Sequence, residues 1–260
     1  MNLTRENYFS SENNMKYMGS SQFKHFMVCE AGALAELRGE YQRDFSVALM
    51  VGSYIDNHFS GTLDLFKSQN PDIFKRDGSL KSEYIGANNC IQRAERDALF
   101  MEFMSGEKQI IRTGSIAGVE FKIQIDVLHK DKIVDLKCMK DFKSIYKDGE
   151  RKPFVEAWGY DIQAAIYQAV HGEKLPFYIA GITKEKEPDI EILDIPQSVM
   201  DDALAIVENY AARFHAIKIG LIDPERCGKC DYCKSTKILT RPIDYRLLGE
   251  GLIMEGAGDE

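Results

Sequence analysis

The chain has 260 residues, of which 44% are hydrophobic and 28% charged, and its formal net charge is -8 at pH 7. This length allows one large core or two modest ones, and no apolar run approaches the roughly 18 residues that a membrane span needs. The negative charge argues weakly against nucleic-acid binding. Two stretches are nevertheless locally basic: residues 130–152 carry eight Lys or Arg against five Asp or Glu, and residues 224–246 carry six against three.

Hydrophobic spacing predicts three helices in the first part of the chain. The first is capped by Ser20 or Ser21 and ends near Gly39. The second covers about residues 44–61 and the third about 82–104, with a loop between them. These helices form an N-terminal helical part that we place at residues 1–106.

The hydrophobic period then changes to that of strands. Alternation over residues 119–126 predicts a strand with one buried face, and residues 133–138 predict a more buried strand after a short turn. A helix over about 155–171, strands over 177–182 and 190–195, and a helix over about 198–219 follow. No repeat or linker interrupts the pattern. We expect one α/β domain over residues 1–260, with a catalytic core at 107–196 and a C-terminal helix and cysteine motif at 197–260.

Two neighbouring strands carry the residues with the clearest chemistry. Asp135 and Lys137 are two positions apart and therefore project from one face of their strand, while Asp126 ends the preceding strand. A hairpin would bring two carboxylates and an ammonium together, which suits metal-assisted phosphodiester hydrolysis with Mg²⁺ or Mn²⁺. A buried Asp135–Lys137 ion pair or a half-exposed edge strand would explain the same pattern. The acidic-x-Lys pattern also occurs outside this apolar strand, at Glu120–Lys122, Asp141–Lys143 and Glu150–Lys152.

The helix over 155–171 has a polar stripe at helical spacing. Tyr160, Gln163 and Tyr167 share one side, and these groups can bind DNA beside a metal site. An ordinary polar helix surface gives the same stripe. The opposite side offers Trp158, Ile162, Ile166 and Ala169.

Four cysteines at the two ends of the chain suggest a second metal site. Cys227, Cys230 and Cys233 are spaced C-x2-C-x2-C, and Cys29 could complete tetrahedral thiolate ligation. A disulfide framework and unrelated thiols are the alternatives. The polar N-terminus has no secretory apolar segment, which favours a reducing cytoplasmic compartment and therefore metal over disulfides.

Taken in order, these motifs resemble those of the PD-(D/E)xK nuclease superfamily. Asp126, Asp135-Leu-Lys137 and Gln163-x-x-x-Tyr167 are similar to its RecB-like branch, and the segment from Ser20 to Cys29 is similar to the branch's S-x-x-x-x-F/Y-x-x-C entry. The resemblance covers residues 20 to about 234 and is greatest to the RecE-like exodeoxyribonuclease 8 group of phages and bacteria. It implies a restriction-endonuclease-like core with a central mixed sheet flanked by helices. It further implies a [4Fe-4S] cluster on the four cysteines, which would join the termini.

Two departures from the family pattern leave alternatives open. The family's G-x-x-x-H helix motif carries a metal-binding His, whereas Gly52 is followed at that spacing by Asp56, and His58 comes two residues later. We favour Asp56 slightly because oxygen ligands suit Mg²⁺, and His58 is the rival; Asp126, Asp135 and the backbone of Leu136 complete the implied ligand set. The short last gap of the cysteine motif leaves Zn²⁺ as an alternative to the cluster.

The resemblance implies a metal-dependent deoxyribonuclease, an exonuclease by preference, in phage or bacterial recombination or repair. DNA is the implied substrate and a phage single-strand annealing recombinase an implied partner. A homo-oligomer is left open, and no membrane contact is expected. The alternative is a catalytically inactive nucleic-acid-binding protein with a structural cysteine site. Strand polarity and the choice between exonuclease and endonuclease are not decided by these residues.

Overall fold

The computed structural model describes residues 3–43, 46–147 and 149–245. The first part is helical. Its elements are α1 (Ser11–Lys16), α2 (Ser20–Val28), α3 (Glu30–Leu37), α4 (Val47–Phe59), α5 (Leu63–Gln69), η1 (Pro71–Ile73), α6 (Ser82–Glu95) and α7 (Ala98–Phe103). The remainder comprises β1 (Glu107–Ile116), β2 (Val119–Leu128), β3 (Ile133–Met139), β4 (Ile145–Lys147), β5 (Glu150–Lys152), α8 (Phe154–Ala157), α9 (Tyr160–His171), β6 (Phe177–Thr183), β7 (Ile190–Ile195), α10 (Gln197–Lys218) and α11 (Asp231–Ser235).

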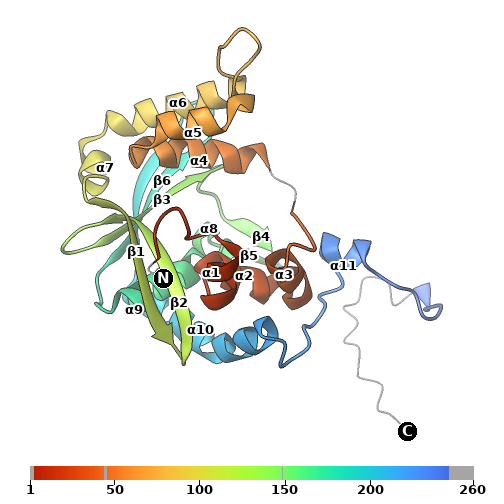
Figure 1. Cartoon of the computed structure of the whole chain (residues 1–260). Helices are drawn as coiled ribbons and strands as arrows, with labels where there is room; N and C mark the ends of the chain where they lie inside the picture. Colours follow the sequence, from red (N-terminus) through yellow and green to blue (C-terminus); the bar gives the residue numbers. More distant parts are fainter. Residues whose placement is uncertain (1–2, 44–45, 148, 246–260) are drawn as a thin grey trace.

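A mixed five-stranded sheet forms the centre of the described structure (Figure 1). Its strand order is β1-β2-β3-β6-β7. Only the β3–β6 pair is parallel, because α8 and α9 carry the chain back across the sheet between these two strands. The expectation of a central mixed sheet flanked by helices is confirmed.

Helices cover both faces of the sheet and bury two apolar clusters. One cluster unites α2, α3, α9 and α10 with Phe121, Ile123 and Ile125 of β2. The other unites α4, α6 and α7 with Val134 and Leu136 of β3. Alternation along β3 therefore sends apolar side chains into both clusters. Within the described residues, no helix combines the length and apolarity that crossing a bilayer requires.

Two buried lysines fix the N-terminal segment against the sheet and α10. Lys218 donates to the carbonyls of Asn14 and Tyr17 and to Oε1 of Gln22, at 2.8–2.9 Å. Lys122 of β2 donates to the carbonyl of Tyr8 and to Oδ1 of Asn14. Sequence alternation places Lys122 on the polar side of β2, and the structure shows why this side is nevertheless buried: the segment before α2 covers it.

Local backbone chemistry divides three helices that the sequence pattern predicts as continuous. Cys29 is extended between α2 and α3, and its Sγ accepts from the N–H of Gly32 and caps α3. Asp97 caps α7 in the same way, which separates α7 from α6. Gly159 has φ +63° and separates α8 from α9. Strand β1 and the β4–β5 hairpin were not predicted.

Candidate functional site

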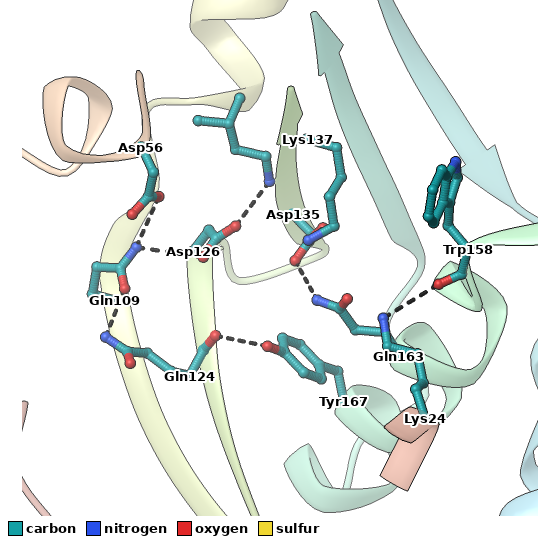
Figure 2. Close-up of polar contacts among 11 residues, drawn as sticks. Lys24, Asp56, Gln109, Gln124, Asp126, Asp135, Lys137, Trp158, Gln163 and Tyr167 are labelled. Atoms are coloured by element: carbon teal, nitrogen blue, oxygen red, sulfur yellow. Dashed lines mark hydrogen bonds and ion pairs between the residues drawn. The ribbon is translucent and has the colours of Figure 1, made fainter. Parts of the chain in front are cut away.

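The site lies where β2 and β3 separate. These strands pair only through Val127 with Val134 and Leu128 with Ile133. One position further along, Asp126 and Asp135 face this opening, and the N–H of Leu136 donates to Oδ2 of Asp126 at 2.9 Å instead of to the backbone of β2. A carboxylate thus replaces a strand partner, and the sheet splits where the acidic side chains are placed (Figure 2).

Asp135 and Lys137 of β3 form the ion pair that their spacing predicts. Nζ of Lys137 lies 2.6 Å from Oδ2 of Asp135, whose residue is only 2% exposed. Gln163 of α9 donates from Nε2 to Oδ1 of the same carboxylate at 2.6 Å. Both oxygens of Asp135 are therefore held from opposite sides, which fixes the carboxylate in place.

A second group of side chains joins Asp126 to α4. Nε2 of Gln109 lies 3.3 Å from Oδ1 of Asp56 and 3.4 Å from Oδ1 of Asp126. Oε1 of Gln109 in turn accepts from Gln124 at 2.6 Å. One amide nitrogen therefore sits between two carboxylates that belong to different layers of the fold (Figure 2).

Gln109 is a site residue that sequence reasoning missed. Its φ is +56°, a left-handed conformation that non-glycine residues rarely adopt. The β1–β2 pairing runs on both sides of Gln109 and Asp126 but omits these two residues. Strain of this kind often accompanies a functional site. The only available signal was the polar Gln109 before the apolar pair Ile110 and Ile111, and this signal predicts neither a strand nor its partner.

Burial and like charges alter the acidity of the site. Burial, reinforced by the charges of Asp135 and Asp56, raises the pKa of Asp126 well above its usual range. Burial also raises the pKa of Asp56 to about 6. For Lys137, burial alone would lower the pKa, but Asp135 and Asp126 outweigh it and raise the pKa, so Lys137 remains an ammonium. A cation bound nearby would favour the ionised form of these carboxyl groups.

The raised pKa of Asp56 predicts a pH-dependent stability in the absence of divalent ions. Folding raises this pKa from 3.8 to about 6, so the native state binds the proton more tightly than the unfolded chain. The free energy of unfolding should therefore fall as pH rises from about 4 to about 6. Above about pH 6 the carboxyl is ionised in both states, and the cost of ionising it in the folded protein no longer changes with pH. Asp56→Asn should remove this cost. In EDTA, its Tm should match that of the parent near pH 4 and exceed it by several degrees above pH 6.

The control for this prediction is Asp64→Asn, because Asp64 is an exposed aspartate on the neighbouring helix α5. Thermal unfolding of the three proteins across pH 4–8 measures the difference. An Asp56→Asn variant no more stable than the parent at pH 7, with the same pH profile, would show that this carboxylate carries no buried charge.

A cleft of about 1060 Å³ opens beside the acidic residues. Asp56, Gln109, Gln124, Asp126 and Tyr167 line its floor. The N-terminal segment and the helices α2, α3, α4 and α5 supply its walls. Of the three site carboxylates, Asp56 and Asp126 line the cleft, so it can admit an extended ligand to these two.

The predicted polar stripe of α9 points inward. Gln163 is 6% and Tyr167 8% exposed, so the interpretation as a solvated helix surface is wrong. The hydroxyl of Tyr167 donates to the carbonyl of Gln124 at 3.0 Å, on the edge of β2 that β3 leaves free. Tyr160 is less buried, and its ring lies 5.3 Å from Nζ of Lys137. Gln163 and Tyr167 therefore hold Asp135 and the β2 backbone in place by hydrogen bonds from α9. DNA contact by the residues of the stripe stays a prediction.

The structure separates the two candidate ligands of α4. Asp56 reaches Gln109 and the site, whereas Nε2 of His58 lies 2.8 Å from Oε1 of Glu95 on α6. Their divergence follows from their separation by two positions on a helix. Of the predicted positions, the structure brings together Asp56, Asp126, Asp135, Leu136, Lys137, Gln163 and Tyr167.

The four predicted cysteines also meet. Sγ atoms of Cys29, Cys227, Cys230 and Cys233 all lie within 4.8 Å of one another. Cys29 and Cys233 are 3.5 Å apart, and backbone N–H groups of the surrounding turns donate to the sulfurs. An ion-pair network supports this junction: Glu30 accepts from Arg213 of α10 at 2.6 and 2.9 Å and from the N–H of Glu225.

Comparison with known protein families gives one assignment that covers most of the chain. A family model described as a PDDEXK-like domain of unknown function (DUF3799) matches residues 19–236. The chain belongs to this family. The site described above lies within the matched range of the PDDEXK-like domain, and nucleases with this domain generally use divalent metal ions.

Solved structures support the same assignment. The crystal structure of a "Putative exonuclease" from Eubacterium rectale is 42% identical, has a TM-score of 0.91, and is matched over 97% of this chain and 100% of that chain. LHK-Exo in complex with dAMP is 12% identical with a TM-score of 0.44, over 83% of this chain and 95% of that chain, a likeness too weak to add to the assignment. A comparison with curated proteins gives no match. The fold is restriction-endonuclease-like, and the PDDEXK-like domain together with the match to the "Putative exonuclease" supports a nuclease.

Proposed function

We propose that this protein is a Mg²⁺- or Mn²⁺-dependent deoxyribonuclease, an exonuclease by preference, that acts in phage or bacterial DNA recombination or repair. One observation carries the proposal. The Asp135–Lys137 pair, with 2.6 Å between charged atoms, lies beside the Asp56 and Asp126 carboxylates at a split in the sheet. A purely structural ion pair does not require two further half-buried carboxylates whose pKa values are raised.

The residues fit a divalent cation. Asp56, Asp126 and Asp135 offer the oxygen ligands that Mg²⁺ and Mn²⁺ prefer, and their mutual repulsion would be relieved by a bound ion. The amide of Gln109 already places a positive hydrogen-bond donor between two of these carboxylates. When bound, the ion supplies an activated water and offsets charge on the phosphate.

The surrounding side chains have separate tasks in this proposal. Lys137 keeps its proton, so it acts as a fixed positive charge beside the phosphate rather than as a base. Gln163 holds Asp135 in position, and Tyr167 closes the free edge of β2 through the Gln124 carbonyl. Tyr160, partly exposed beside Lys137, is the member of the stripe best placed to touch DNA directly.

Digestion of linear and covalently closed circular DNA tests the function. The parent protein should degrade linear DNA only when Mg²⁺ or Mn²⁺ is present, should stop in EDTA, and should leave closed circles intact. Nicking or linearisation of the circles would identify an endonuclease instead. DNA binding without any metal-dependent cleavage would support the alternative of an inactive nucleic-acid-binding protein.

The cysteine site is proposed to hold a [4Fe-4S] cluster, with Zn²⁺ as the alternative. Four sulfurs within 4.8 Å of one another suit either group. A single-strand annealing recombinase as partner and a homo-oligomer are proposed from the family resemblance, and a cytoplasmic location is proposed with them.

A further inference from the structure

The single tryptophan of this chain is exposed beside the proposed active site. Trp158 is 58% exposed and ends α8, although the sequence pattern groups it with the apolar side of the following helix. Trp is highly buried on average, and an exposed indole offers a large flat face with which a ligand can pack. Trp158 comes two residues before Tyr160, whose ring lies 5.3 Å from Nζ of Lys137.

The loop that presents Trp158 is held by Lys24 of α2. Gly159, the next residue, has φ +63°, and a Cβ there would lie 2.8 Å from Cδ of Lys24. Glycine therefore meets two requirements at once: it adopts the left-handed turn and leaves room for the lysine stem. Nζ of Lys24 lies 3.4 Å from the carbonyl of Trp158.

The same lysine connects this loop to the proposed catalytic lysine. The ring of Tyr160 is 5.5 Å from Nζ of Lys24 and 5.3 Å from Nζ of Lys137. The ammonium of Lys24 contacts a backbone carbonyl and an aromatic ring, and neither of these carries a full negative charge. Burial and the charge of Lys137 lower the pKa of Lys24 to about 8, as expected for a cation whose neighbourhood lacks sufficient negative charge. A ligand phosphate would supply that charge.

We propose that Trp158 and Lys24 form a nucleotide subsite for single-stranded DNA next to the reacting phosphate. The indole stacks on an unpaired base, and the Lys24 ammonium contacts a phosphate of the same strand. A paired base inside a duplex already has both faces stacked, so the subsite selects a single-stranded stretch. This inference rests on the proposed function, because it assigns a further contact to the same DNA substrate.

Intrinsic fluorescence tests the stacking directly, since the emission comes from one indole. The full-length protein is titrated with an unlabelled 12-nucleotide oligo-dT in EDTA, so that no cleavage occurs, and binding is measured separately by anisotropy of a labelled oligo-dT. The indole emission should be quenched with the same midpoint as the anisotropy change. Binding with unchanged emission would overturn the subsite.

Variants separate stacking from charge. Trp158→Ala should weaken oligo-dT binding by about tenfold, and Trp158→Phe should retain most of it. Lys24→Met keeps the stem over Gly159 and should lower the slope of log K against log salt by about 0.7. Leu99→Ala on α7 is the control, because Leu99 is 55% exposed. Tm values verify that each variant folds.

The outcomes distinguish this inference from the proposed function. A parent protein that degrades DNA with Mn²⁺, and whose Trp158→Ala variant binds oligo-dT as tightly as the parent, contradicts the subsite alone. A parent that neither binds nor cleaves DNA contradicts the nuclease and the subsite together. Equal weakening by Leu99→Ala would also overturn the assignment of Trp158.

Discussion

Replacing Asp135 by Asn should reduce metal-dependent DNA cleavage by at least about 10³-fold, the scale expected for a central catalytic group. The amide of Asn can still accept from Gln163 but loses the charge that pairs with Lys137 and that a cation needs. Calorimetric titration should show weakened Mn²⁺ binding. DNA binding measured in EDTA should not weaken, because the substitution removes a negative charge that repels phosphate and no ion bridges the carboxylate to the DNA under these conditions.

Asp194→Asn provides the matched control for this substitution. Asp194 is an exposed aspartate on β7 of the same sheet, so its replacement should leave cleavage and Mn²⁺ affinity unchanged. Because Asp135 is buried, Tm is compared for both variants to verify folding. A folded Asp135→Asn protein with activity within a few-fold of the parent would remove Asp135 from the proposed site.

Cys29→Ser should remove the metal from the cysteine site and destabilise both ends of the described chain. The ligands join α3 to α11 across about 200 residues, so metal binding free energy appears as folding free energy. We expect a loss of at least about 3 kcal/mol, which corresponds to a Tm decrease of roughly 6–12 °C. Hydrogen exchange should increase around residues 29–32 and 225–235 together.

Metal and sulfide analysis of anaerobically purified protein identifies the occupant. Iron with sulfide and absorbance near 400 nm would support the cluster. Stoichiometric zinc would support a metal site on the four cysteines and contradict its assignment as an iron–sulfur cluster. Cys138→Ser is the control, since Cys138 lies outside the four-sulfur group and its replacement should leave the metal content unchanged. Metal-free parent protein as stable as Cys29→Ser would contradict the metal junction.

Sequence periodicity was sufficient to predict the helices and strands whose packing or pairing partners are close in the sequence. The strand context of Asp135 and Lys137, and the short turn before them, predicted a hairpin with Asp126, because a strand with one apolar face is followed at once by a more buried strand. The cysteine spacing predicted that three sulfurs would meet, and Cys29 was predicted as the fourth because tetrahedral thiolate ligation needs one more ligand. Such patterns depend on neighbouring residues and on the period of side chains.

Features that depend on distant pairing were not predictable in this way. Strand β1 exists because it pairs with β2 along nearly its full length, although its own residues alternate poorly. Gln109 reaches the site only through this pairing and through its left-handed backbone. Gln163 has the spacing of a surface residue, and only the position of β3 shows that it is buried against Asp135. Tertiary contacts determined these outcomes.

The meeting of Cys29 with the C-terminal cysteines also restricts how the protein is made. During synthesis, Cys227 is added 198 residues after Cys29. At ribosomal rates of about 5–20 residues per second, the first thiol waits roughly 10–40 s for its partners. Metal insertion is therefore a late event on the ribosome or after release. Throughout that interval the nascent chain carries an unprotected thiol between α2 and α3, open to oxidants and to competing metal ions.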